Sequence, residues 1–134
     1  MKKILPFILL FLLTYIKSFC QDEFEMTEGD TTYVMKKYYL VLLKANPDKE
    51  PLDSARVMDI QQAHLDNISR LADLGKIVIA GPMGDDGNLR GIFVMDCLSL
   101  DEAESLVQTD PAIQQKRLLA EVHPWWAAKG SQLP

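Results

Sequence analysis

The chain has 134 residues, with 14 basic and 19 acidic side chains and a formal net charge of −5 at pH 7. This length allows one compact domain with its own core but is too short for two. The acidic balance argues against nucleic acid or an anionic membrane surface as a partner, because both carry negative charge themselves.

The N-terminus has the pattern of an export signal. Lys2 and Lys3 precede a mainly apolar run, Ile4–Ile16, which is too short to cross a bilayer. Ser18 and Cys20 are small residues at the −3 and −1 positions of a cleavage site after Cys20. We therefore expect residues 1–20 to be a signal peptide, and the protein to be secreted or periplasmic with no stable membrane insertion after cleavage. Acylation of Cys20 in a lipoprotein is the open alternative.

Cleavage there would make the chain more acidic. The first 20 residues hold three of the 14 basic side chains and none of the 19 acidic ones, so the remainder carries 11 − 19 = −8. Residues 21–35 are acidic and polar and begin without a sustained apolar period, which predicts a flexible leader. We place the folded domain at residues 36–127, followed by a tail over 128–134.

The first predicted strand and helix follow the leader. Tyr38–Leu43 is a β-favouring run that ends before the turn-forming Asn46-Pro47-Asp48. Asp53 is a candidate N-cap for a helix from Ser54 to Leu74, and Gly75 stands where a left-handed C-terminal residue is needed.

Two further strands and a second helix come next. Ile77–Ala80 ends at Gly81-Pro82, and the glycine-rich residues 84–88 connect it to Ile92–Met95, which predicts a hairpin. Ser99 and Glu102 have the spacing of a capping box, and the helix that they begin is expected to end at residues 109–111.

The last predicted element is a strand over Leu118–Val122, ended by Pro124. The order is then β-α-β-β-α-β, the ferredoxin-like plan, an α+β fold with two helices on one face of an antiparallel four-stranded sheet. The other face would be left open, and an exposed apolar sheet face normally has a partner. We therefore expect a homodimer.

Several residues that attract attention have simple structural interpretations. Cys97 lies within an apolar run and is expected to be a small buried core residue. Trp125 and Trp126 are expected to cover an apolar edge or to join a subunit interface, although an aromatic ligand platform is the other reading.

The sequence gives no metal signature. The only two histidines, His64 and His123, are far apart without a cysteine cluster, and His123 is expected to be structural or exposed. The spacing of Asp85 and Asp86 does not match an EF-hand loop, so a solvated turn explains them. We predict no required metal and no cofactor, since phosphate-binding and serine-hydrolase motifs are also absent from the sequence.

A set of short motifs resembles the YCII-related family. The resemblance runs from about Tyr38 to Trp126 and keeps both the order and the approximate spacing of the motifs. They are Gln62-Ala63-His64-Leu65, Ala80-Gly81-Pro82, Gly91-Ile92-Phe93, Thr109-Asp110-Pro111 and Glu121-Val122-His123-Pro124.

The resemblance implies a dimeric α+β barrel similar in plan to muconolactone isomerase, with pockets between sheet and helices. It also implies a His–Asp dyad, which maps onto His64 and Asp110. Some members of the family are linked to the breakdown of aromatic compounds, and this chain departs from the usual member in its export signal and acidic leader.

His64 is the strongest candidate for chemistry, because it lies on an otherwise apolar helical stripe where an imidazole needs a hydrogen-bond partner. With Asp110 opposite, it could act as general base or acid on a small molecule, in an isomerase-like or lyase-like reaction. Gly81 and Pro82 would then contact the substrate, since a glycine lets a ligand approach the backbone closely; the alternative is that they only end the strand. The alternative is a non-catalytic ligand-binding or structural homodimer in the cell envelope, in which the same pair is only a buried hydrogen bond.

Overall fold

The computed structural model of the chain describes residues 22–134. The expected signal peptide, the cleavage site after Cys20 and the lipoprotein alternative lie outside the described residues. Within the described part, no helix is both long enough and apolar enough to cross a membrane.

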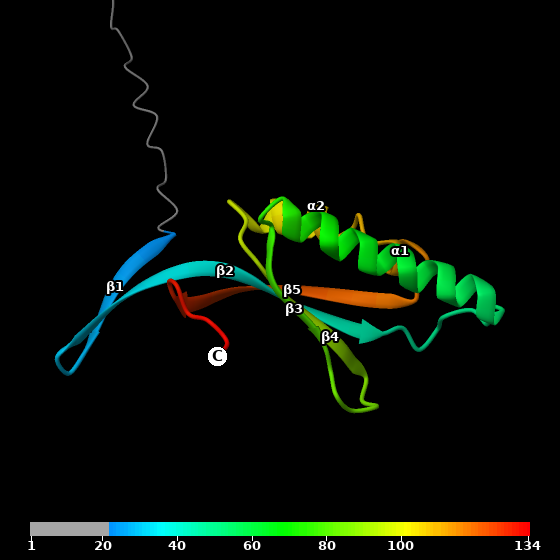
Figure 1. The fold of residues 1–134 in the computed structure, drawn as a ribbon, viewed down its shortest axis with the longest axis horizontal. Helices are drawn as coiled ribbons and strands as arrows, with labels where there is room; N and C mark the ends of the chain where they lie inside the picture. The colour runs from blue at the N-terminus through cyan, green and yellow to red at the C-terminus, as the bar shows by residue number, and fades with distance from the viewer. Residues whose placement is uncertain (1–21) are drawn as a thin grey trace, which may run out of the picture.

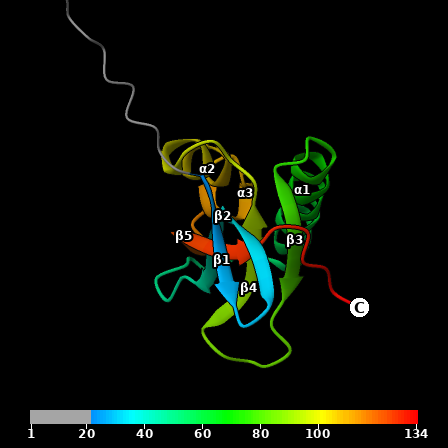
Figure 2. The same ribbon diagram turned by 90° about the vertical axis from the view of Figure 1, so that its left-hand side faces the viewer.

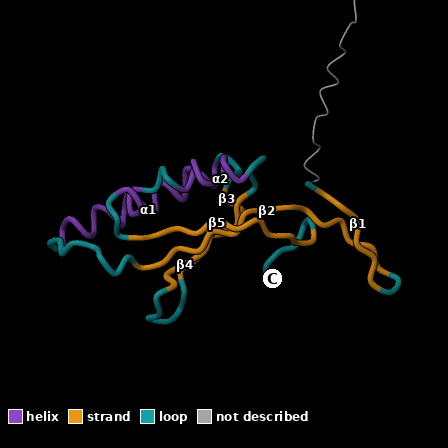
Figure 3. Tube along the Cα trace, turned by 180° about the vertical axis from the view of Figure 1, so that it is seen from behind, coloured by secondary structure: helices purple, strands orange, loops and turns teal. Residues whose placement is uncertain are grey.

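The fold is α+β, with an antiparallel sheet and its helices on one face (Figures 1 and 3). The described elements are β1 (Glu23–Glu28), β2 (Thr31–Ala45), α1 (Ser54–Asp73), β3 (Ile77–Pro82), β4 (Leu89–Met95), α2 (Leu100–Val107), α3 (Pro111–Gln114) and β5 (Leu118–Ala128). In the sheet, β2 pairs with β4 and with β5, and β4 pairs with β3. This is the predicted ferredoxin-like plan, and the sheet is not closed into a barrel.

The core lies between the sheet and the helices. Side chains alternate along β2, so Tyr39, Val41 and Leu43 are buried, and Phe93 and Met95 of β4 lie beside them in register. From the helix layer, Leu71, Ala103 and Val107 join the same cluster. Cys97 belongs to it too, as predicted.

The helix boundaries form as the sequence indicated. The Asp53 carboxylate accepts a hydrogen bond from the Arg56 N–H at 2.8 Å and caps α1, and Gly75 takes a φ of 70° just after that helix. Ser99 accepts from the Glu102 N–H at 3.1 Å and caps α2, while the Glu102 carboxylate accepts from the Leu98 N–H.

Residues 23–28 and 31–35 form strands, whereas the sequence predicted a flexible leader there. β1 pairs with the first half of β2 as a hairpin, with the turn at Gly29 and a fifth strand added to the sheet (Figure 2). Long-range contacts hold this hairpin: the rings of Phe24 and Trp126 meet edge to face at 4.8 Å, and Glu23 pairs with Lys129. These partners are about a hundred residues away along the chain, so local pattern gave no sign of them.

The C-terminal strand is longer than predicted, because it continues through Pro124 to Ala128. β5 is an edge strand that pairs only with β2. Pro124 has no N–H to donate, and an edge strand tolerates this because its free side needs no hydrogen bonds to a neighbouring strand. The short helix α3 was not predicted either; four residues carry too little periodicity to be recognised.

Candidate functional site

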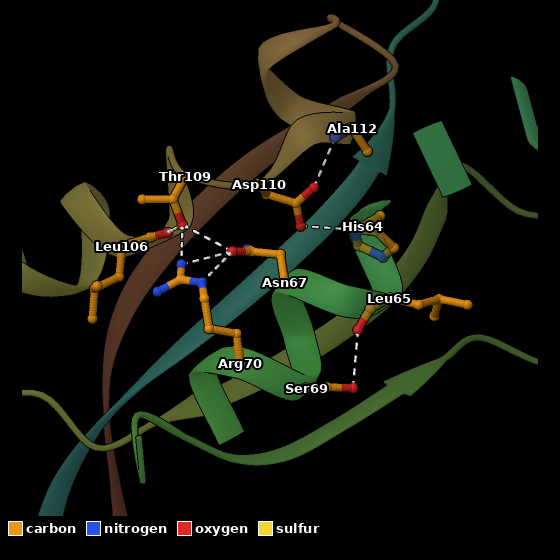
Figure 4. A network of polar contacts seen from close by, with 9 residues as sticks. All are labelled: His64, Leu65, Asn67, Ser69, Arg70, Leu106, Thr109, Asp110 and Ala112. Atoms are coloured by element: carbon orange, nitrogen blue, oxygen red, sulfur yellow. Dashed lines mark hydrogen bonds and ion pairs between the residues drawn. The ribbon is translucent and has the colours of Figure 1, made fainter. Parts of the chain in front are cut away.

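His64 and Asp110 form a buried pair between α1 and the start of α3 (Figure 4). The Nδ1 atom of His64 lies 2.6 Å from Oδ2 of Asp110. His64 is 8% exposed and Asp110 is 0% exposed. The two residues are 46 positions apart in the sequence, and the structure brings them together as the family resemblance implied.

Asp110 has two partners, one for each carboxylate oxygen. Oδ1 accepts from the Ala112 N–H at 2.8 Å, so the residue is the N-cap of α3. Pro111 occupies the first turn, where its missing N–H costs nothing. The cap fixes the carboxylate in one orientation and aims Oδ2 at the imidazole.

The hydrogen bond with Asp110 decides which His64 nitrogen is available. An ionised carboxylate only accepts, so Nδ1 carries the proton and Nε2 keeps its lone pair. In the described part of the chain, no buried side-chain nitrogen or oxygen lacks a hydrogen-bond partner. The recorded hydrogen bond of the His64 ring is made through Nδ1. Among the described residues, Nε2 has no recorded hydrogen-bond partner, and His64 lines a cavity.

A second polar network attaches α1 to the loop before Asp110 (Figure 4). Arg70 donates to the Asn67 side chain at 2.7 Å and to the Thr109 hydroxyl at 3.0 Å. The same hydroxyl donates to the Leu106 carbonyl at 2.6 Å. Because Thr109 immediately precedes Asp110, the network holds the carboxylate at a fixed distance from α1.

A cavity of about 420 Å³ opens beside the imidazole, between α1 and the β3–β4 hairpin. Its lining is mainly apolar, and the Phe93 ring lies nearly parallel to the His64 ring with centroids 6.3 Å apart. The lining residues are Leu43, Gln61, His64, Leu65, Ile68, Ala80, Gly81, Pro82, Arg90, Gly91, Phe93 and Leu118. A cavity of this size accommodates a small ring-bearing molecule.

Gly81 and Pro82, the predicted substrate-binding residues, both line the cavity from the edge strand β3. The glycine that packing requires, however, is Gly91 on the neighbouring strand. A Cβ at Gly91 would lie 2.8 Å from the backbone oxygen of Gly81, whereas a Cβ at Gly81 would meet nothing within 4 Å. The close approach of β3 and β4 therefore depends on Gly91.

Two further polar residues, Arg90 and Gln61, line the cavity with His64 and were not predicted from the sequence. Gln61 lies three residues, about one helical turn, before His64 on α1, so helical spacing could have indicated it. Arg90 follows a turn-rich loop and gave no signal, because simple strand alternation places it on the opposite face from Gly91.

The remaining candidates lie away from the dyad. His123 is exposed on β5, with Glu121 at 3.7 Å, and Trp126 covers the β1 hairpin. Burial raises the pKa of the Cys97 thiol to about 11 and keeps it protonated. Among residues 22–134, no group of three or more His, Cys, Asp or Glu side chains is placed to hold a metal ion.

The fold and the site define an α+β protein of ferredoxin-like plan with a buried His–Asp pair beside an apolar cavity. The model of the YCII-related domain matches residues 37–125, and the chain belongs to this family. No curated protein matches the sequence.

A solved structure of 5-chloro-2-hydroxyhydroquinone dehydrochlorinase from Burkholderia phenoliruptrix AC1100, in complex with 2,5-dihydroxybenzoquinone, is similar to this chain. The two are 28% identical, and the match covers 66% of this chain and 92% of the dehydrochlorinase, with a TM-score of 0.49.

Proposed function

We propose that the protein is a small-molecule enzyme that uses His64 and Asp110 for cofactor-free acid–base chemistry, as an isomerase or a lyase-like enzyme. The observation that carries this proposal is the buried imidazole held at Nδ1 by Asp110 while the ring lines a cavity of about 420 Å³. A mainly apolar cavity with a few polar groups is the usual setting of a small-molecule site, which supports the enzymatic reading.

The proposed chemistry is a proton transfer at Nε2 of His64. As general base, Nε2 takes a proton from a carbon or hydroxyl of the substrate, and the Asp110 carboxylate stabilises the imidazolium that forms. The imidazolium then returns the proton to a second atom of the substrate or to a leaving group. The first outcome is an isomerisation and the second an elimination, and neither requires a metal or a redox partner.

One observation favours a second reading. Asp110 also caps α3 through its other oxygen, so burial of this carboxylate has a structural use independent of catalysis. In that reading, the protein is a non-catalytic ligand-binding or structural homodimer, and the pair only anchors α3 against α1.

The two readings predict different behaviour of the imidazole. We expect the ring NMR signals of His64 to shift when small carbonyl or aromatic compounds are added, and Asp110→Asn to change that response. Asn keeps an oxygen that can cap α3, which separates the loss of the carboxylate from the loss of the fold. The chain has only two histidines, so His64→Asn identifies the His64 signals by their loss.

Once a converted compound is found, we expect His64→Asn to lower kcat about a hundredfold or more, as the loss of a general base does. Met58→Gln, at an exposed position of the same helix that does not line the cavity, should leave kcat unchanged. An unchanged rate in His64→Asn, or His64 signals that respond to no compound, would refute the enzymatic proposal and favour the structural homodimer.

We also propose that the protein works as a homodimer after export. The sheet face opposite the helices carries the partly exposed Leu40, Leu42 and Ile92, and no described helix covers it (Figure 1). Packing two such faces together would bury apolar surface on both copies. Export rests on the sequence of residues 1–20.

A further inference from the structure

Arg90 is an exposed residue of β4 that lines the cavity, and an irregularity in the strand places it there. Leu43 of β2 pairs with Gly91 and the next residue, Lys44, pairs with Leu89, so Arg90 is an extra residue on its strand. This is a β-bulge, a feature that re-aims a side chain. Without it, Arg90 would alternate onto the open face of the sheet; with it, the side chain lines the cavity beside Leu43 and His64.

The Arg90 guanidinium retains most of its hydrogen-bonding capacity. The side chain donates one recorded hydrogen bond, from Nη1 to the Gly87 carbonyl at 3.2 Å. The ion pairs among the described residues do not involve Arg90. A guanidinium has five N–H donors in a planar fork that matches a carboxylate.

The formal charge on the residues that line this cavity is positive. Among its lining residues Arg90 carries the only formal charge, and no Asp or Glu is present to neutralise it. Arg90 also lines a second hollow of about 310 Å³, where Lys49 and Arg117 are the other charged residues. The acidic residues Asp48 and Glu50 line a third hollow together with Lys116 and Arg117, and Arg90 does not line it.

We propose that Arg90 is a substrate-binding residue and that the cavity selects molecules with an anionic oxygen, either a carboxylate or an ionised ring hydroxyl. The guanidinium binds the anionic oxygen at the cavity mouth while the apolar body packs between Leu65, Ile68 and Phe93, within reach of the imidazole. This inference deepens the proposed function and rests on it for the role of His64.

Arg90 would contribute to the reaction as well as to binding. Removal of a proton next to a carboxylate or from a ring places more negative charge on the substrate, and a guanidinium beside the cavity stabilises that charge. The proton goes to Nε2 of His64 and its electron pair stays on the substrate until the proton returns. No oxidant or co-reactant is needed.

Binding can be tested on the full-length chain without knowing the natural substrate. The probes are three anions, benzoate, phenylacetate and 4-nitrophenolate, each compared with a neutral analogue: benzamide, phenylacetamide and 4-nitroanisole. We expect at least one anion to shift the His64 ring signals, to bind more tightly than its neutral analogue, and to weaken as salt is raised.

Arg90→Gln should weaken binding of that anion about tenfold to a hundredfold, the usual effect of losing a charge-assisted hydrogen bond. It should leave binding of the neutral analogue unchanged. Arg117→Gln is the matched control, because it removes a nearby cation that does not line the His64 cavity, and should change anion binding less than about twofold. Unchanged thermal unfolding of Arg90→Gln would show that the bulge is intact.

The proposal is overturned if none of the three anions shifts the His64 signals, if neutral analogues bind equally well, or if Arg90→Gln binds the anion like the wild type. Failure of the proposed function gives a different result. In that case Arg90-dependent anion binding persists while no compound is converted, and His64→Asn alters binding only.

Discussion

At the scale of single residues, Asp110 carries two requirements at once. One carboxylate oxygen caps α3 and the other orients His64, and both contacts are shorter than 3 Å. A residue that satisfies both must be short, must accept two hydrogen bonds and must stand directly before α3. Glu is too long for this geometry, and Asn would keep the cap while removing the negative charge beside the imidazole.

The sequence was sufficient to predict this pair, but it did not predict the other polar residues that line the cavity. The position of His64 on an apolar stripe, together with the family motifs, predicted a partnership with Asp110, and the 2.6 Å contact confirms that the two side chains meet. Whether the pair is catalytic stays a prediction. Arg90 could not be found in this way, because its placement depends on one unpaired residue in β4 rather than on any periodicity.

Cys97 supplies a residue-scale prediction. Burial raises its pKa from 9.0 to about 11, so near pH 8 the thiolate fraction falls about a hundredfold below that of an exposed thiol. In a Cys20→Ser background, which leaves one cysteine, we expect iodoacetamide to modify the native protein at least about a hundredfold more slowly than the urea-unfolded chain. Equal rates in the two states would mean that Cys97 is not buried.

At the scale of elements, the boundaries of the two capped helices, α1 and α2, were easier to predict than the boundaries of the strands. Caps at Asp53, Ser99 and Gly75 are local signals, and they fixed helix boundaries to within a residue or two. β1 and the extension of β5 past Pro124 depend on neighbours supplied by distant parts of the chain, so local composition suggested a flexible leader and an early strand end.

The start of α2 gives a pH prediction. Glu102 accepts from Lys76 at 2.7 Å and from the Leu98 N–H, and these contacts lower its pKa below the ordinary 4.5. The folded state thus prefers the carboxylate, so this contribution to stability is complete above pH 4.5 and is lost as pH falls through the lowered pKa. We expect Glu102→Gln to lose less stability than the wild type between pH 5 and 3, measured by urea unfolding.

Glu104 is a suitable control, because it lies on the same helix and its side chain is exposed, with no ion pair recorded for it. Glu104→Gln should follow the wild-type pH dependence. Parallel curves for Glu102→Gln and the wild type would contradict the proposed role of the Lys76–Glu102 pair.

At the scale of the whole molecule, the layer arrangement leaves one face of the sheet without a helical cover (Figure 3). Leu42 lies near the middle of that face, between Ile92 on β4 and Glu121 on β5. The pairing of two such faces would give the dimeric barrel that the family resemblance implies.

We expect the wild-type chain to elute at twice its monomer mass in size-exclusion chromatography with light scattering. Leu42→Asp should elute as a folded monomer, because a charge at the centre of the interface would be buried without a partner. Met58→Asp on α1 is the control: Met58 is 70% exposed on the helix side, so this variant should remain dimeric. A monomeric wild type at tens of micromolar would refute the dimer.

The central strand β2 depends on the last strand of the chain. Eleven residue pairs join β2 to β5, from Met35 with Ala128 to Ala45 with Leu118. During synthesis, β2 emerges first and waits for its partner until nearly the whole chain has been made, so the sheet can be completed only afterwards. Until then one edge of an apolar strand stays open to pairing with other chains, and a product that stops before Leu118 would keep that edge permanently.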